Sequence, residues 1–153
     1  MNVEMLMWYE MDVDVEDNDT FFVTSKSFPE LATFGDDMEA ALLHARSPIE
    51  EAIAARIAHG NPVPCPMPNT TGKGYFVQVP ALTFLKSALY MTCAAQGITR
   101  AELGRRLNWH REQVDRLFRI DHKSKLDQIE DAFRAIGVES IFSFPEIRQD
   151  RAA

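Results

Sequence analysis

Short runs of β-favouring residues open the chain, and a helical spacing of apolar residues follows them. Residues 4–14 and 20–25 form two such runs, and residues 16–19, Glu-Asp-Asn-Asp, separate them as a turn. Residues 31–34 form a third run after a break at Pro29. Short runs of this kind, bounded by turn residues, are typical of strands. We therefore predict a three-stranded meander at the start of the chain.

Helical spacing begins directly after the third run. Apolar residues recur every three or four positions over residues 38–57, which predicts an amphipathic helix that lies on the sheet. Asp36 and Glu39 have the spacing of a capping box that begins this helix. Pro48 interrupts the pattern, but its context is itself that of a helix start, so we expect a kink or a brief restart there.

Prolines limit the segment that follows this helix. Residues 60–74 contain proline at four alternate positions, which prevents a helix and favours an extended chain. Residues 75–79 form another β-favouring run, which we expect to be the fourth strand of the same sheet. The sequence therefore predicts an α+β protein, with a βββαβ domain over residues 1–79 and an all-α domain over residues 80–153.

The second half of the chain carries several short helical patterns. An apolar face begins after Pro80 and continues until Gly97, a residue type that commonly ends helices. This face comprises Leu82, Leu85, Leu89 and Cys93. Residues 99–102 and 124–127 have the capping-box pattern of two further helix starts. Residues 138–144 alternate like a strand, which suits pairing with another subunit.

Residues 100–117 have the spacing of a DNA-binding helix-turn-helix. When Arg100 is taken as the first position, all five apolar positions that lock the two helices together are filled, namely Leu103, Leu107, Trp109, Val114 and Leu117. Gly104 stands where the helices cross closely. Asn108 stands at the turn, which requires a left-handed backbone, and asparagine tolerates that conformation better than most residues. The pattern predicts a helix-turn-helix, and an ordinary three-helix core is the alternative.

The residues around the second helix of this motif provide the candidate DNA contacts. Residues 99–125 contain eight Lys and Arg against four Asp and Glu, a surplus that attracts phosphate. The candidate set is Arg100, Arg111, Glu112, Gln113, Asp115, Arg116, Arg119 and Lys123. Motif geometry assigns base edges to Arg111, Glu112 and Asp115, and phosphates to Arg100, Arg119 and Lys123. For any one arginine, a solvated helix face is the alternative. Because one such motif reads only a few base pairs, we expect a homodimer or a tetramer on operator DNA.

The net charge of −7 conceals an asymmetry between the two halves. Residues 1–70 hold 13 Asp and Glu against 3 Lys and Arg, a charge of −10, whereas residues 71–153 hold 10 against 13, a charge of +3. The first half should repel nucleic acid, and the second half suits it. Two different partners are therefore expected for the two halves.

Several other classes of protein are disfavoured. No apolar run approaches the roughly 18 to 20 residues of a membrane span, and residues 1–14 are acidic where a signal peptide would be basic, so we expect a cytoplasmic protein. Cys65 and Cys93 lack the spacing of a zinc site. The acidic run from Asp12 to Asp19 fails the calcium-loop pattern, because Asp17 occupies the glycine position. Without a recognisable nucleophile, base or phosphate-binding motif, we expect no enzyme activity, cofactor or metal.

Motifs along nearly the whole chain share the order and spacing of one known family. They run from Phe28 to Leu31, Thr33 to Asp36, Ile57 to Pro66, Phe76 to Pro80 and Gly97 to Leu107. With these motifs the chain resembles the HicB antitoxins of HicA-HicB toxin-antitoxin systems, in the branch that carries a helix-turn-helix. The more acidic first hairpin and Ser27, where an aspartate often stands, depart from the family pattern and bear on which toxin is recognised.

The resemblance implies two partners. It implies a partial RNase H-like N-terminal domain without nuclease activity that binds HicA, a small basic ribonuclease toxin, and a helix-turn-helix that represses the chain's own promoter. An acidic half suits a basic partner because it steers association. The residues that touch the toxin stay open: Tyr9, Phe22 and Phe34 suit the core and a contact surface equally.

Two other functions remain compatible with the sequence. One is a solitary helix-turn-helix transcription regulator whose N-terminal domain senses a small molecule. The other is a metal-dependent ribonuclease that uses the acidic run from Asp12 to Asp19. Neither has a motif of its own beyond these features.

Overall fold

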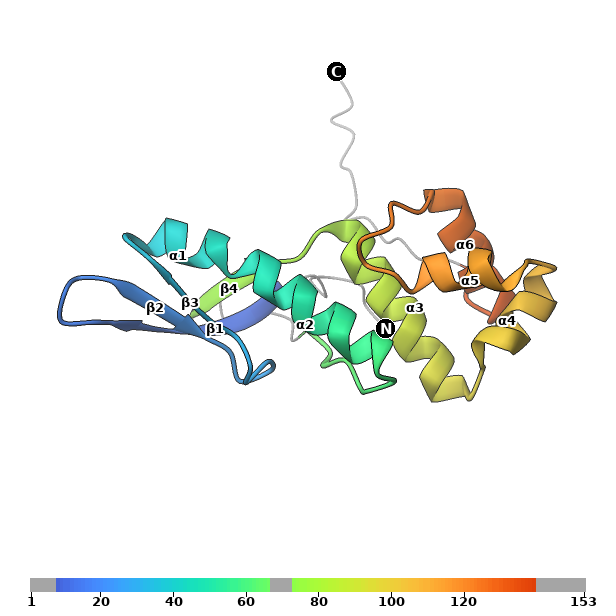
Figure 1. Cartoon of the computed structure of the whole chain (residues 1–153), viewed down its shortest axis with the longest axis horizontal. Helices are drawn as coiled ribbons and strands as arrows, with labels where there is room; N and C mark the ends of the chain where they lie inside the picture. Colours follow the sequence, from blue (N-terminus) through green and yellow to red (C-terminus); the bar gives the residue numbers. More distant parts are fainter. Residues whose placement is uncertain (1–7, 67–72, 140–153) are drawn as a thin grey trace, which may run out of the picture.

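The computed structural model describes residues 8–66 and 73–139, and within these ranges the protein has an α+β architecture (Figure 1). The fold class predicted from the sequence is confirmed. In chain order the elements are β1 (Trp8–Val15), β2 (Phe21–Thr24), β3 (Ala32–Gly35), α1 (Met38–His44), α2 (Arg46–Ala58), β4 (Tyr75–Gln78), α3 (Ala81–Gln96), α4 (Arg100–Leu107), α5 (Arg111–Leu117) and α6 (Leu126–Ala135).

The four strands form one antiparallel sheet in the order β3-β2-β1-β4. The predicted meander is confirmed, because β1 pairs with β2 and β2 pairs with β3. The predicted fourth strand joins the other edge, where Tyr9 of β1 lies opposite Val77 of β4. The Glu16 N–H closes the turn between β1 and β2 by donating to the Thr20 carbonyl at 2.8 Å. β1 is therefore a central strand with a neighbour on both sides.

Two helices cover one face of the sheet, in place of the single helix predicted from the spacing. The restart expected at Pro48 occurs at Ala45, the residue between α1 and α2. Pro48 then lies in the first turn of α2, where its missing N–H costs no helical hydrogen bond. The predicted cap at Asp36 is wrong, because Asp37 is the N-cap of α1 and its carboxylate accepts from the Ala40 N–H at 2.7 Å. The order of the N-terminal elements is therefore βββααβ.

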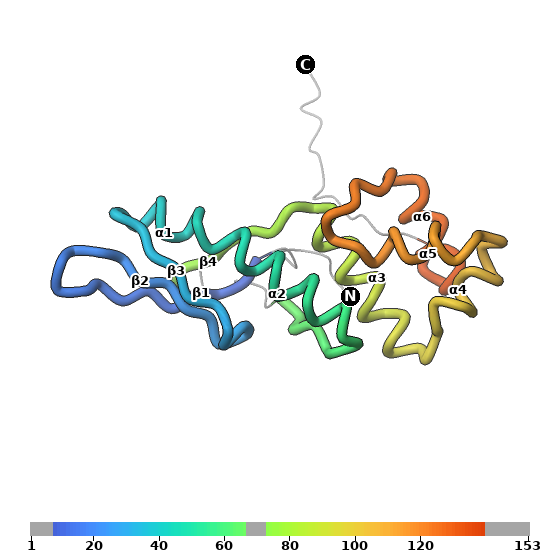
Figure 2. Tube along the Cα trace, in the orientation of Figure 1, coloured from blue at the N-terminus to red at the C-terminus, as the bar shows by residue number. Residues whose placement is uncertain are grey.

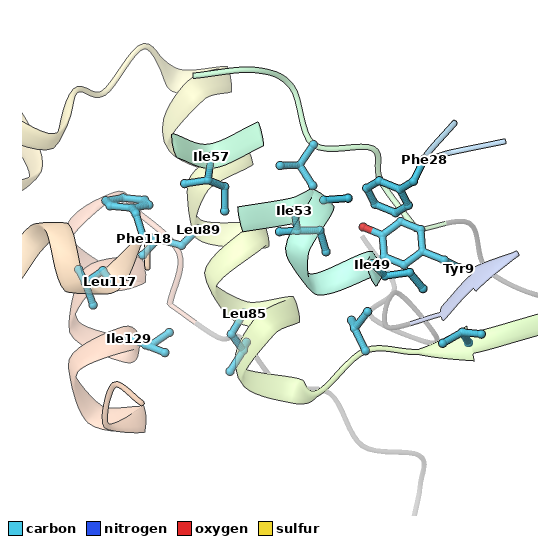
Figure 3. Packing of buried hydrophobic residues seen from close by; sticks show 14 of the residues in the cluster. Tyr9, Phe28, Ile49, Ile53, Ile57, Leu85, Leu89, Leu117, Phe118 and Ile129 are labelled. Carbon is cyan, nitrogen blue, oxygen red and sulfur yellow. The ribbon is translucent and has the colours of Figure 1, made fainter. Parts of the chain in front are cut away.

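A continuous hydrophobic core extends from the sheet to the C-terminal helices (Figure 3). At the sheet, Tyr9 and Phe28 pack edge to face with 4.8 Å between ring centroids. In the middle, α2 contributes Ile53 and α3 contributes Leu89, both fully buried. Ile129 of α6 is buried at the far end. α2 and α3 therefore form the packed layer between the sheet and the C-terminal helices.

Most of the helix caps predicted for the C-terminal half are present in the structure. Gly97 ends α3 in the left-handed conformation with φ of 66°, and the Thr99 hydroxyl accepts from the Glu102 N–H at 3.1 Å at the start of α4. The predicted cap at Ser124 is wrong, because Lys125 is the N-cap of α6. The Ser124 hydroxyl instead donates to a carbonyl at the end of α5.

Some predicted segments extend beyond the described residues. The predicted strand at 138–144 lies outside them from residue 140 onward, so its part in self-association stays a prediction. Of the proline-rich segment 60–74, residues 61–66 contain neither helix nor strand, as expected, and residues 67–72 lie outside the described ranges.

The molecule is elongated, with the sheet at one end and α4, α5 and α6 at the other (Figure 2). The acidic turn between β1 and β2 and the basic segment around α5 therefore lie far apart. Among the described residues, no helix combines the length and apolar character that crossing a bilayer requires.

Candidate nucleic-acid interface

Hydrogen bonds hold the short connection between α4 and α5. Asn108 ends α4 in the left-handed conformation with φ of 54°, as predicted from its side chain. The Trp109 N–H then donates to the Gly104 carbonyl at 3.0 Å. The His110 N–H donates to Gln113 Oε1 at 2.8 Å and begins α5. The connection between the two helices is thereby held at both of its ends.

Gly104 allows the two helices to approach closely. A Cβ atom there would lie 3.3 Å from Val114 Cγ2 and 3.4 Å from the Trp109 carbonyl oxygen. The close approach of the two helices at this position, predicted from the spacing, is confirmed. All five predicted apolar side chains pack against the core. Leu103, Val114 and Leu117 are fully buried, and Leu107 and Trp109 are partly buried.

A hollow of about 780 Å³ lies between α4 and α5. Its walls include the predicted contacts Arg100 and Arg111, together with Arg105. Arg105 and Arg106 both bind the carboxylate of Glu102, and their hydrogen bonds lower its pKa. Cationic side chains therefore line the hollow, and the neighbouring carboxylate offsets part of their charge.

Asp115 brings two of the predicted contacts together. Its carboxylate lies 3.0 Å from Arg100 Nη1 and 3.7 Å from Arg111 Nε. The Arg100 guanidinium also lies over the Phe118 ring, 4.9 Å from its centroid. Arg100 is thus held between two partners, whereas the Arg111 side chain is 93% exposed. Asp115 therefore holds Arg100 in place, whereas Arg111 extends into solvent beside it.

Arg119 is paired as well, but two other cations of the candidate set are not. Arg119 Nη2 lies 2.8 Å from Asp121 Oδ2, and this bond raises the pKa of Arg119 and lowers that of Asp121. Arg116 and Lys123 are exposed and form no ion pair within residues 8–66 and 73–139. Their positive charges are therefore available to an external anion.

Glu112 and Gln113 complete the candidate set on the first turn of α5. Glu112 is exposed and has no ion-pair partner in the described part of the chain. Gln113 is exposed too, but its side-chain oxygen is engaged by the His110 N–H. The amide N–H groups of the Gln113 side chain can still donate hydrogen bonds to an acceptor outside the protein.

Lys86 of α3 supports α5 and was not among the residues predicted from the sequence. Its ammonium is buried and donates to the backbone carbonyls of Arg116, Arg119 and His122 at 2.8, 2.6 and 2.6 Å. Burial lowers the pKa of Lys86 to about 8. The available signal was its position three residues before Leu89, on the apolar face of the helix, where a lysine needs partners.

Comparison with known proteins places this fold in a family. Residues 8–88 match the family model described as the HicB-like antitoxin of bacterial toxin-antitoxin systems, which is more than half of the chain. The chain belongs to the HicB-like family. The resemblance read from the sequence motifs is thereby confirmed.

Curated HicB proteins are similar over most of their length. Antitoxin HicB of Pseudomonas fluorescens (strain Pf0-1) is 29% identical over 143 residues, which are 94% of this chain and 97% of that protein. Antitoxin HicB of Escherichia coli (strain K12) is 27% identical over 119 residues, 78% of this chain and 86% of that protein. Antitoxin HicB 2 of Photorhabdus laumondii is 32% identical over 109 residues, 71% of this chain and 76% of that protein.

The HicB-like family match and the candidate nucleic-acid interface occupy different parts of the chain. The match ends at residue 88, within α3, and so covers the sheet, α1 and α2. The similarity to the Pseudomonas protein covers 94% of the chain and therefore includes α4 and α5. The HicB-like assignment thus rests on the sheet half, and the interface around α5 has to be argued from its own residues.

Proposed function

We propose that this HicB-like chain is an antitoxin that neutralises a small, basic, mRNA-cleaving toxin of the HicA type and represses its own operon by binding operator DNA. Family membership supports the antitoxin role, and the similar curated proteins are themselves named antitoxins. We assign toxin neutralisation to residues 1–79 and DNA binding with dimerisation to residues 80–153. The partial RNase H-like nature of the first region stays a prediction from the resemblance.

The arrangement of cations around α5 is the observation that carries the DNA-binding part. We propose that α4 and α5 form a helix-turn-helix whose second helix enters the major groove. The side chains of Arg116 and Lys123, which are exposed and have no ion pair within the described residues, bind phosphates, and Arg111 reaches base edges. Arg100 and Arg119 reach phosphates only by exchanging their carboxylate partners, which makes them weaker contributors.

The charge of the N-terminal half supports the other part of the proposal. Residues 1–70 carry a charge of −10, which attracts and orients a basic protein and repels RNA. Among the described residues, no group of three or more His, Cys, Asp or Glu is arranged to hold a metal ion. We propose a cytoplasmic homodimer, because the operator and the mRNA are cytoplasmic and paired half-sites need two copies of α5.

The decisive experiment titrates the purified chain into an RNA-cleavage assay that contains the small basic protein encoded beside its gene. Cleavage is expected to stop near a one-to-one ratio. Continued cleavage without complex formation would reject the antitoxin role and favour a solitary regulator with a ligand-sensing N-terminal domain. A thermal-shift response to metabolites would support that regulator directly.

A further inference from the structure

One face of the sheet packs under helices, and the other face is open. Side chains alternate between the two faces along a strand. The inward positions Tyr9, Met11, Val23 and Val77 are at most 5% exposed, and α1 and α2 lie together on this side (Figure 1). No described helix covers the opposite side, which we call the open face and define by Glu10, Asp12, Asp14, Phe22, Phe34 and Phe76.

Strand register places acidic and aromatic side chains next to each other on the open face. Asp14 lies opposite Phe22, and Phe22 lies opposite Phe34 on the next strand. The rings of Phe22 and Phe34 are 4.6 Å apart between centroids, and Phe34 is 52% exposed. On the other side of β1, Glu10 lies opposite Phe76. The open face is therefore a sheet surface on which aromatic rings flank a central row of carboxylates.

The carboxylates of this row have no ion-pair partner among the residues that the structure describes. Glu10, Asp12 and Asp14 occupy successive outward positions of β1, about 7 Å apart by strand geometry. None of them forms an ion pair in the described part of the chain. Like charges this close repel one another, and the repulsion is relieved only when cations approach. The row is therefore arranged to gain from a positively charged occupant.

A hollow at the edge of the open face is also lined by carboxylates and aromatic rings. It has a volume of about 440 Å³ and is lined by Glu16 and Asp17 of the turn and by the Phe22–Phe34 pair, among others. An arginine guanidinium binds carboxylates through its donors and stacks on aromatic faces. Carboxylates and rings that line one hollow therefore match an arginine side chain better than an aliphatic one.

The charge of the open face narrows the possible occupants. Nucleic acid and anionic lipid surfaces are repelled by its carboxylates. A second copy that docked the same face against itself would bring two carboxylate rows together, which like-charge repulsion opposes. A protein surface that carries arginine and lysine is attracted to the carboxylates, and it is therefore the occupant that the charge of the open face favours.

We propose that the open face is the surface through which this chain holds its toxin, with cationic toxin side chains lying along the carboxylate row and against the Phe22–Phe34 pair. This inference rests on the proposed antitoxin function and adds the location of the contact. The open face lies at the end of the molecule opposite α5 (Figure 1). Toxin and operator DNA are therefore bound at the same time without competing for space.

The test uses the full chain and the small basic protein encoded beside its gene. Glu10→Gln with Asp14→Asn removes two exposed charges from the open face. Its control, Glu39→Gln with Glu51→Gln, removes two exposed charges from α1 and α2. Phe34→Ala truncates an exposed ring on the open face, and Leu43→Ala on α1 is its control, at 63% exposure. Calorimetric titration gives the dissociation constant, and circular dichroism confirms folding.

Each open-face variant is expected to raise the dissociation constant about tenfold or more, whereas both controls bind like the wild type. If all four variants bind and inhibit like the wild type, the inference that the toxin binds the open face is overturned, and the proposed antitoxin function stands. If the wild type itself neither binds nor inhibits, the proposed function fails, and the inference fails with it. If instead the open-face variants lower the mass of the chain measured alone by light scattering, the face joins two copies and the inference is overturned.

Discussion

The side chain of Lys86 on α3 is joined to the backbone of Arg116 on α5 by a 2.8 Å hydrogen bond from Nζ to the carbonyl oxygen. The same ammonium donates to the carbonyls of Arg119 and His122, both at 2.6 Å. Arg116 lies in the last turn of α5, where carbonyls lack a full set of helical partners, and Arg119 and His122 lie in the segment that follows the helix. Because α3 also packs against α2, this lysine fixes the end of α5 to the layer that carries the sheet.

Replacing Lys86 with methionine tests this link. Lys86→Met keeps the apolar stem but removes the ammonium donor from three carbonyls that each keep a weaker local donor, so the free energy of unfolding is expected to fall by about 1 to 3 kcal/mol. Urea denaturation measures the change. Lys123→Met, at an exposed lysine on the surface, is the control and is expected to stay within about 0.5 kcal/mol of the wild type. Equal effects of the two substitutions would refute the structural role of Lys86.

Stability should also depend on pH through Lys86. Burial lowers the pKa of Lys86 in the folded protein to about 8, from 10.5. Between these values the unfolded chain binds more protons than the folded one, so the contribution of Lys86 to stability rises as the pH rises through this window. Below pH 8 both states are protonated and the cost of burying the charge is fully present.

The measurement is the difference in unfolding free energy between the wild type and Lys86→Met from pH 7 to 11. Between pH 8 and pH 10.5 the unfolding free energy of the wild type is expected to rise relative to that of Lys86→Met by up to about 3 kcal/mol. Other titrating groups cancel in this comparison. A difference that is flat, or that falls with rising pH, would contradict the lowered pKa.

Arg116 provides the sharpest test of DNA binding. Arg116→Ala removes an exposed charge that has no ion pair in the described part of the chain, and it keeps the backbone carbonyl that Lys86 binds. Operator affinity, measured by fluorescence anisotropy on the DNA upstream of the gene, is expected to fall several-fold, and the salt slope is expected to decrease by about one. Arg134→Ala on α6, which is paired with Asp131 at 2.9 Å, is the control. Unchanged affinity and slope would remove Arg116 from the interface.

The close approach at Gly104 gives a prediction on stability and function together. Gly104→Val places a branched side chain where a Cβ atom already lies 3.3 Å from Val114 Cγ2. The expected cost is about 1 to 3 kcal/mol of unfolding free energy, with weaker operator binding because α5 is displaced. Ala101→Val, on the exposed face of the same helix, costs only helix propensity, about 0.5 kcal/mol. Thermal denaturation compares the two, and similar losses would show that the helices are not tightly packed here.

Features that depend on a few neighbouring residues followed from the sequence. Asn108 and Gly97 have the left-handed backbone that asparagine tolerates and that glycine adopts for lack of a Cβ atom, and Thr99 caps α4 through its hydroxyl. Where two adjacent residues offered similar chemistry, the prediction missed by one position, as with Asp36 in place of Asp37. Local propensity barely separates such neighbours, and only the packing of α1 on the sheet selects between them.

The sequence by itself determined most of the elements, the family and the charge of each half, because strand alternation and helical spacing are local and charge is additive. Tertiary structure decided how these parts meet. The alternation of β1 makes one set of side chains apolar, but only the docking of α1 and α2 leaves Glu10, Asp14 and Phe34 together on an open face. Likewise, the sequence gives no reason for a lysine at position 86 on an apolar helix face, until the structure brings to it the carbonyl of Arg116, 30 residues later in the chain, and those of Arg119 and His122. Contacts between segments this far apart depend on how the helices pack, which spacing along the chain does not encode.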